Sequence, residues 1–343
     1  MITVNALKVK DESQDNLPSG SWQTALANAI RDPNELLQLL ELSEGEYKKQ
    51  LYLPDNFKLL VSRSYIKKMK KGDWDDPLLR QVLPIQDEAK IVAGFVADPV
   101  GDLNAVISSG VLQKYQGRVL LITTGACAIH CRYCFRRHFP YANSMPDKDK
   151  WQETLLSIQK DKSIHEVILS GGDPLMIPDE RLQIMCEDIA KISHIKTLRF
   201  HTRMPIVLPE RINSAFLRWT KKLPIKKVMV IHANHANELD QDVGAYLKKL
   251  HEADFTLLNQ SVLLKGVNDN VNALSELSHR LFSFQVLPYY LHQLDKVEGA
   301  AHFEVDRAEA IQLQKRLKKC LPGYLVPRLV EEISGERSKL AIE

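Results

Sequence analysis

The sequence predicts an α/β fold: a partial barrel of six parallel strands, with a helical region before it and a C-terminal tail that closes the barrel mouth. After Gly117, strand-like and helical patterns alternate, and from the second strand they recur about every thirty residues, the length of one βα unit. Ligand-capable residues follow every candidate strand. Since a barrel gathers all its strand ends at one rim, we prefer a curved partial barrel to an open doubly wound sheet.

The candidate strands are short runs rich in β-branched or large apolar residues, at 119–122, 166–169, 197–200, 228–231, 255–258 and 284–287. Helical patterns lie between them, at 151–159, 180–192, 214–222, 238–253 and 273–282. We therefore divide the chain into an N-terminal accessory region (1–110), a barrel (111–300) and a C-terminal helix and tail (301–343).

The N-terminal region opens with residues 1–21, a polar and turn-rich stretch expected to be a poorly ordered lead-in. Residues 22–42 predict a helix that is interrupted near Asp32 and Pro33. A lysine run at 67–71 predicts a solvated helix face, and a docking patch for an acidic partner is the alternative.

Composition favours small-molecule chemistry. The 343 residues carry 46 Lys and Arg against 43 Asp and Glu, so a formal charge of +3 gives little support for a nucleic-acid or membrane surface. The five cysteines provide no disulfide framework, and we expect Cys186 and Cys320 to be ordinary buried thiols. With no signal-like or membrane-spanning stretch in the sequence, we expect a cytoplasmic protein.

The clearest chemical motif is the C-x3-C-x2-C run of Cys127, Cys131 and Cys134, directly after the first candidate strand. Zinc would need a fourth ligand, such as His130 or His138. A 4Fe-4S cluster held by three thiolates instead leaves one iron open to an outside ligand. The spacing resembles the signature of the radical S-adenosylmethionine (SAM) enzymes, in which SAM binds that iron.

A second motif, Ser170-Gly171-Gly172-Asp173, follows the next candidate strand. Glycines let a backbone approach a ligand closely, although they also form ordinary turns. One βα unit after the cysteines, this motif resembles the element with which radical SAM enzymes hold the amino end of SAM.

Six further segments make the resemblance more specific: CRYCFRRHF, SGGDPL, MPIVLPERI, IHANHANEL, NQSVLLKGVND and LPYYLHQLD. Together they resemble the lysine 2,3-aminomutase family over roughly residues 76–340. The resemblance implies an isomerase that uses a 4Fe-4S cluster, SAM and pyridoxal 5'-phosphate (PLP) for a radical 1,2-amino shift. Within the family, the chain resembles the bacterial branch that makes (R)-β-lysine for modification of elongation factor P.

The same resemblance implies roles for individual residues. Lys339, in the segment SGERSK, matches the lysine that forms the Schiff base with PLP. Arg136 matches the arginine that binds the substrate carboxylate, for which a guanidinium fork is suited. Asp295 matches the carboxylate that pairs with the far ammonium of lysine. Glu332 matches a second such carboxylate, although catabolic members have aspartate there.

Four other residues match cofactor contacts in the family. Lys114, which replaces a common arginine, and Tyr115 fall where the family contacts PLP. Gln260 matches a residue between the two cofactors, and His232 a histidine beside them. We expect His130 to pack the cysteine loop and not to bind iron.

The resemblance implies free L-lysine as substrate, a reductant such as flavodoxin or ferredoxin, a functional link to elongation factor P and its lysylating ligase, and a homo-oligomer. Two alternatives remain within radical SAM chemistry: an aminomutase for another amino acid such as glutamate, and an RNA-modifying enzyme. A non-catalytic iron-sulfur or zinc scaffold is a third alternative.

Overall fold

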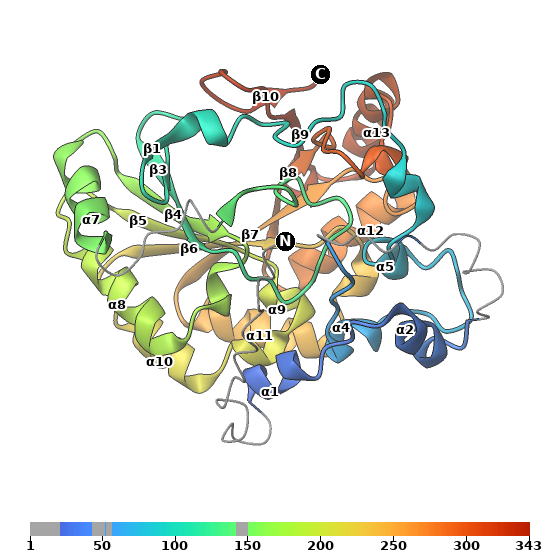
Figure 1. Ribbon diagram of the computed structural model, residues 1–343, viewed down its shortest axis with the longest axis horizontal. Helices are drawn as coiled ribbons and strands as arrows, with labels where there is room; N and C mark the ends of the chain where they lie inside the picture. The colour runs from blue at the N-terminus through green and yellow to red at the C-terminus, as the bar shows by residue number, and fades with distance from the viewer. Residues whose placement is uncertain (1–20, 43–51, 53–56, 142–149) are drawn as a thin grey trace, which may run out of the picture.

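The computed structural model describes residues 21–42, 52, 57–141 and 150–343 (Figure 1). The predicted lead-in therefore lies outside the described residues, apart from Ser21, which caps the first helix. The described strands form a single ten-stranded sheet whose spatial order follows the sequence from β1 to β10. This continuous order produces one curved sheet.

Seven of the strands are parallel and form the body of the sheet: β3 (Arg118–Thr124), β4 (Glu166–Gly171), β5 (Thr197–Thr202), β6 (Lys226–His232), β7 (Phe255–Val262), β8 (Leu287–His292) and β9 (Arg328–Glu331). Antiparallel strands extend it at both ends: β1 (Val106–Ser108) and β2 (Val111–Leu112) beside β3, and β10 (Leu340–Ala341) beside β9. The ends do not pair with each other, so the predicted α/β partial barrel is confirmed.

The crossover helices lie around the outside of the curved sheet (Figure 1): α7 (Trp151–Lys160), α8 (Asp179–Ala190), α10 (Ser214–Lys221), α11 (Gln241–Glu252) and α12 (Val271–Ser283). Polar side chains set their starts. Asn213 accepts a hydrogen bond from the backbone N–H of Phe216 at 2.9 Å, and Asp240 accepts one from Val243 at 2.8 Å. Each cap satisfies a backbone donor that the helix leaves unpaired.

The prediction for the sixth strand was wrong in position. Phe284 is the C-cap of α12, Gln285 has a positive φ of 61°, and β8 begins only at Leu287. Phe284 packs beside Gly244 of α11, where an added Cβ would lie 2.3 Å from the Phe284 ring. The apolar run therefore ends a helix before it starts a strand. Tyr289 and Tyr290 consequently lie inside β8 and not beyond its end.

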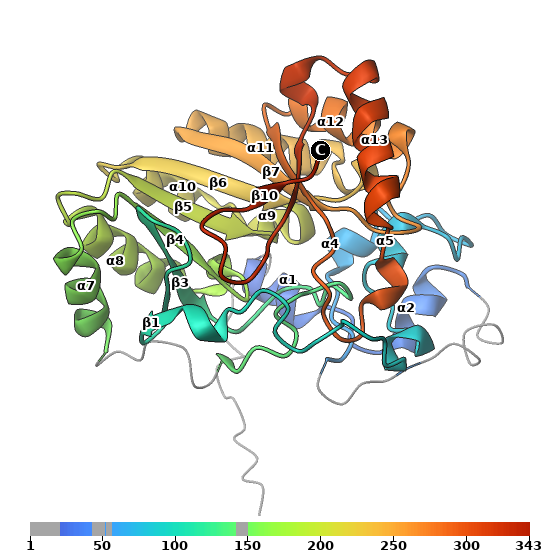
Figure 2. The same ribbon diagram turned by 90° about the horizontal axis from the view of Figure 1, so that it is seen from above.

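The C-terminal tail contributes to the sheet itself, which the six-strand prediction did not include. After α13 (Arg307–Cys320), β9 pairs in parallel with β8, and β10 turns back to pair with β9. Figure 2 shows this hairpin crossing the open side of the barrel. The turn between β9 and β10 holds Glu332 and Lys339, which both line the central cavity. The tail closes the barrel mouth, as predicted.

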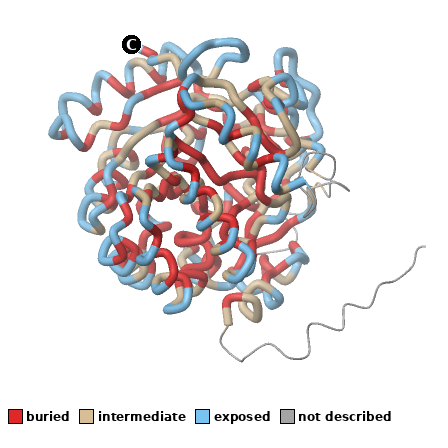
Figure 3. Tube along the Cα trace, turned by 90° about the vertical axis from the view of Figure 1, so that its left-hand side faces the viewer, coloured by how far each residue is buried: buried red, intermediate tan, exposed pale blue. Residues whose placement is uncertain are grey.

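The N-terminal region packs directly onto the barrel. Its helices are α1 (Trp22–Ala27), α2 (Pro33–Leu39), α4 (Arg63–Ile66) and α5 (Pro77–Arg80). The predicted interruption is confirmed, because Asp32 caps α2 and Pro33 is its first residue. One buried apolar cluster contains both Leu36 of α2 and Phe200 of β5. Figure 3 shows the buried segments gathered inside a largely exposed outer layer.

The lysine run at 67–71 is not a uniformly solvated face. Lys68 turns inward and donates hydrogen bonds to the carbonyls of Ile206 (2.6 Å) and Glu238 (3.1 Å). Burial lowers the pKa of Lys68 to about 8. Lys70 and Lys71 point outward and pair with acidic groups on the surface. Lys68 therefore joins the N-terminal region to the barrel.

Two further expectations concern cysteines and membranes. Cys186 is buried in α8 as predicted, but Cys320 is exposed at the end of α13, where the helix turns its last residues to solvent. Among the described helices, none combines the length and apolar character needed to cross a bilayer.

Candidate active site

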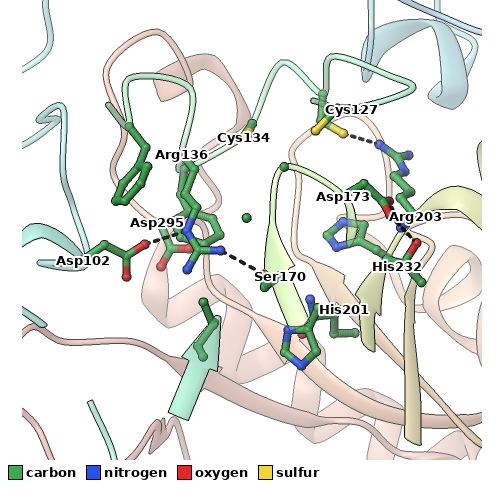
Figure 4. Close-up of a pocket in the computed structure, with 18 of the residues that line it drawn as sticks. Asp102, Cys127, Cys134, Arg136, Ser170, Asp173, His201, Arg203, His232 and Asp295 are labelled. Atoms are coloured by element: carbon green, nitrogen blue, oxygen red, sulfur yellow. Dashed lines mark hydrogen bonds and ion pairs between the residues drawn. The ribbon is translucent and has the colours of Figure 1, made fainter. Parts of the chain in front are cut away.

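A cavity of about 540 Å³ opens at the carboxyl ends of the parallel strands. It is lined by every residue to which the sequence analysis assigned a metal, cofactor or substrate: Lys114, Tyr115, Cys127, Cys131, Cys134, Arg136, Ser170, Gly171, Gly172, Asp173, His232, Gln260, Asp295, Glu332 and Lys339. Residues more than 200 positions apart along the chain, such as Lys114 and Lys339, therefore line one cavity. Figure 4 shows part of this lining, from Asp102 to Asp295.

The cysteine loop is held rigidly by the N-terminal region. The backbone N–H of His130 donates to the Leu60 carbonyl, and that of Arg132 to the Gln81 carbonyl, both at 2.9 Å. Arg132 is fully buried, and its Nε lies 2.8 Å from a Glu88 carboxylate oxygen. The His130 ring contacts the Lys58 carbonyl at 2.7 Å, so it packs the loop.

Zinc would require a compact donor set. Within the described part of the chain, no three His, Cys, Asp or Glu side chains are grouped so that they could hold a metal ion. The three loop cysteines are free thiols that line one cavity. Three thiols that share one cavity, with Cys131 and Cys134 both acting electrostatically on Cys127, suit a 4Fe-4S cluster held by three thiolates.

Gly171 and Gly172 bring the end of β4 against the cysteine loop. A Cβ on Gly172 would lie 2.3 Å from the Ala126 carbonyl oxygen, and Gly171 has a φ of 119°. In this close contact, Gly172 donates its N–H to the Thr124 carbonyl at 2.7 Å. The glycines are needed for this approach of two backbones, whether or not they also contact a cofactor.

Asp173 connects neighbouring strand ends. Its carboxylate accepts hydrogen bonds from the Thr202 hydroxyl (2.7 Å), the Arg203 backbone N–H (2.7 Å) and the Leu175 backbone N–H (3.0 Å). Burial raises the pKa of Asp173 to about 6, although these donors oppose the shift. Asp173 therefore holds the end of β5 in place beneath the cavity.

A chain of alternating charges crosses the cavity wall. Asp102 Oδ2 lies 2.6 Å from Arg136 Nε, Asp102 Oδ1 lies 2.6 Å from Lys114 Nζ, and Lys114 lies 2.8 Å from Glu332. Glu332 also pairs with Lys339. Burial would raise the pKa of Glu332, but the ammonium groups of Lys339 and Lys114 outweigh it and lower the pKa to about 2. Glu332 is therefore ionised.

Asp295, in the loop after β8, has a pKa that is shifted in the opposite direction. Burial, and then the negative charge of Glu332, raise its pKa to about 7. The carboxyl group is thus poised to ionise when a cation enters the cavity.

Several residues of the cavity wall escaped the sequence analysis. Asp102, within a turn-forming DPVGD segment, had no motif to mark it. Arg203 stood among the polar residues after the third predicted strand but received no role; its Nη1 lies 2.7 Å from Cys131 Sγ. Tyr133 lies inside the cysteine loop, and its hydroxyl lies 3.1 Å from His232 Nε2. Burial, then Arg203, lower the pKa of His232 to about 3.

The comparisons with known proteins identify the class. Residues 121–215 match the family model described as the radical SAM superfamily. This segment contains the cysteine loop and the Gly171-Gly172 contact. Among solved structures, a radical SAM methyltransferase from Sphaerobacter thermophilus matches with a TM-score of 0.46 and 14% identity, covering 68% of this chain and 73% of that one. The family-model match and the three cysteines at the cavity together are those of a radical SAM enzyme, a class that binds a 4Fe-4S cluster and SAM.

Curated relatives identify the family. The chain is 47% identical to the L-lysine 2,3-aminomutase of Escherichia coli, over 96% of each protein, and 45% identical to that of Haemophilus influenzae, over 93% and 94%. Identity to the Clostridium subterminale enzyme is 30%, over 94% of this chain and 77% of that protein. The chain belongs to the L-lysine 2,3-aminomutase family and is an isomerase.

Proposed function

We propose that this enzyme converts L-lysine to (R)-β-lysine with the help of PLP, and that the product serves the modification of elongation factor P. The names of the relatives support lysine as substrate. The R isomer and the elongation factor P link rest on the sequence likeness to one bacterial branch of the family. The higher identity to the Escherichia coli relative than to the Clostridium relative is consistent with that branch.

The distribution of charge in the cavity is the observation that carries the substrate proposal. Arg136 is buried and keeps an Nη2 edge without a partner among the described residues, which suits a carboxylate. Asp295 and Glu332 supply carboxyl groups for a side-chain ammonium. Glutamate would bring a second negative charge toward these two groups, so the cavity favours lysine over glutamate.

The cofactor proposal rests on the cationic wall around Lys339. Lys339 lines the cavity with one-fifth of its side chain exposed, and Lys114, Arg118 and Arg199 supply positive charge to the same cavity. The Arg118 guanidinium also stacks on the Tyr115 ring at 4.8 Å. An amine beside several cations suits an aldehyde that carries a phosphate.

When bound, the cluster and SAM would supply a hydrogen-abstracting radical, and PLP the conjugated system on which the amino group migrates. The chain itself positions the substrate between Arg136 and Asp295, and the tail hairpin shields the cavity from water. The Lys339 ammonium donates a hydrogen bond to Glu332. This ammonium must lose a proton before the Lys339 nitrogen can act as a nucleophile. A one-electron donor such as flavodoxin or ferredoxin completes the proposal.

The test is anaerobic reconstitution with iron, sulfide and PLP, followed by chiral analysis of the product from L-lysine. We expect (R)-β-lysine, and borohydride reduction should attach PLP to Lys339. Lys339→Ala should abolish both signals, whereas Lys248→Ala, on the exposed face of α11, should change neither. Turnover of glutamate without turnover of lysine would overturn the substrate assignment.

A further inference from the structure

Arg203 makes a direct contact with one of the three cluster cysteines. Its Nη1 lies 2.7 Å from Cys131 Sγ, and its side chain is 7% exposed. Among the described side chains, no other donates a hydrogen bond to a loop cysteine. One thiol of the three is therefore distinguished from the other two by a side-chain hydrogen bond from a buried guanidinium.

The guanidinium is held from the opposite side by three polar groups. Its Nη2 lies 2.8 Å from a Glu238 oxygen, 2.7 Å from Gln81 Oε1 and 3.1 Å from the Tyr65 hydroxyl. These anchors come from the loop after β6 and from the N-terminal region. Because all of them are buried, the guanidinium has little freedom to turn away from the sulfur.

The backbone of Arg203 is fixed as well. Its N–H donates to Asp173 at 2.7 Å, and Asp173 in turn follows the glycines that contact the cysteine loop. The contact between Arg203 and Cys131 is thus built from several parts of the barrel and does not depend on a single flexible side chain.

We propose that Arg203 is a positioning residue for the cluster: its N–H group hydrogen-bonds the Cys131 thiolate in the loaded enzyme and makes the cluster easier to reduce. Reduction adds one electron and hence one negative charge to the cluster. A fixed cation and an N–H donor at a ligating sulfur stabilise the more negative state. The inference rests on the cluster that the radical SAM class implies, not on lysine as substrate.

The test is a redox titration of the reconstituted cluster, followed by electron paramagnetic resonance with dithionite and mediators, without SAM or amino acid. In Arg203→Gln, the ratio of reduced to oxidised cluster at a fixed potential should fall about tenfold. This corresponds to a midpoint potential lower by about 59 mV for one electron. In Arg203→Lys, which keeps the positive charge, the ratio of reduced to oxidised cluster should fall by less.

Arg211→Gln is the matched control. Arg211 is fully buried in the same barrel and donates to the Leu175 carbonyl at 2.6 Å, but it contacts no cysteine. Its loss should lower thermal stability without moving the potential. An unchanged potential in iron-loaded Arg203→Gln would overturn the proposal.

If neither Arg203 variant retains iron, the wild-type enzyme still tests the proposal. With ¹⁵N-arginine incorporated, the reduced cluster should show magnetic coupling to an arginine side-chain nitrogen. Absence of that coupling would contradict the hydrogen bond. Because these measurements omit the substrate, a wrong substrate assignment would leave the result intact.

Discussion

Asp102 and Arg136 form a buried ion pair, with 2.6 Å between Asp102 Oδ2 and Arg136 Nε. Arg136 Nη1 also donates to the Ser170 hydroxyl at 3.1 Å. These two contacts fix the plane of the guanidinium and leave its remaining edge to face the cavity (Figure 4). The orientation of the proposed carboxylate-binding group is therefore set before any substrate enters.

Asp102→Asn should weaken substrate binding. The asparagine keeps the size of the side chain but loses a charge-assisted hydrogen bond, which contributes about 1.5–3 kcal/mol. We expect KM for the amino acid to rise about tenfold, with a smaller change in kcat. Asp188→Asn, on the outer helix α8, is the control and should leave both constants unchanged. An unaltered KM in Asp102→Asn would contradict the positioning role.

Gly172→Ala should displace the cysteine loop. The new Cβ would lie 2.3 Å from the Ala126 carbonyl oxygen, so the two backbones must separate. We expect a loss of about 1–3 kcal/mol in stability and a marked fall in iron bound per chain after reconstitution. Gly323→Ala is the matched control, since nothing lies within 4 Å of its added Cβ. Equal iron content in the two variants would be inconsistent with this account.

Asp295 should make the cofactor-free protein less stable as pH rises. Its pKa is raised to about 7 in the folded state from an ordinary value of 3.8. The contribution of the Asp295 carboxyl group to the free energy of unfolding is therefore fully present below pH 3.8. It is lost as pH rises through 7, by about 4 kcal/mol at most. Urea unfolding at several pH values should show this slope in the wild type and not in Asp295→Asn. Parallel curves for the two proteins would refute the prediction.

Glu332 should have the opposite effect on stability: it should make the cofactor-free protein less stable as pH falls. Its pKa is lowered to about 2 from 4.5, so its stabilisation is present above pH 4.5 and is lost as pH falls toward 2. Glu332→Gln should destabilise the cofactor-free protein by about 3 kcal/mol at pH 6 and by less at pH 3. Glu332→Asp keeps the charge and should retain the pH dependence. The difference in unfolding free energy at the two pH values provides the measurement.

Local patterns in the sequence were sufficient for much of the fold. The first five barrel strands occur where short apolar runs alternate with helical ones, because each such run must bury both of its faces in a parallel sheet. The interruption at Asp32 and Pro33 was likewise readable, since a cap and a proline act within one turn of helix. The sixth strand was misplaced because Phe284 and Val286 are apolar for a different reason: they pack the end of a helix.

By itself, the sequence determined that three thiols gather at one centre, since three cysteines spaced over eight residues are brought together by local geometry, and the resemblance of this run to radical SAM enzymes indicated the chemical class. Only the tertiary structure decided which charges accompany them. Asp102 beside Arg136, Arg203 beside Cys131, and the β9–β10 hairpin that carries Lys339 into the cavity all join segments distant in the chain. Such contacts depend on how the strands are ordered around the barrel, and no short stretch of sequence contains that information.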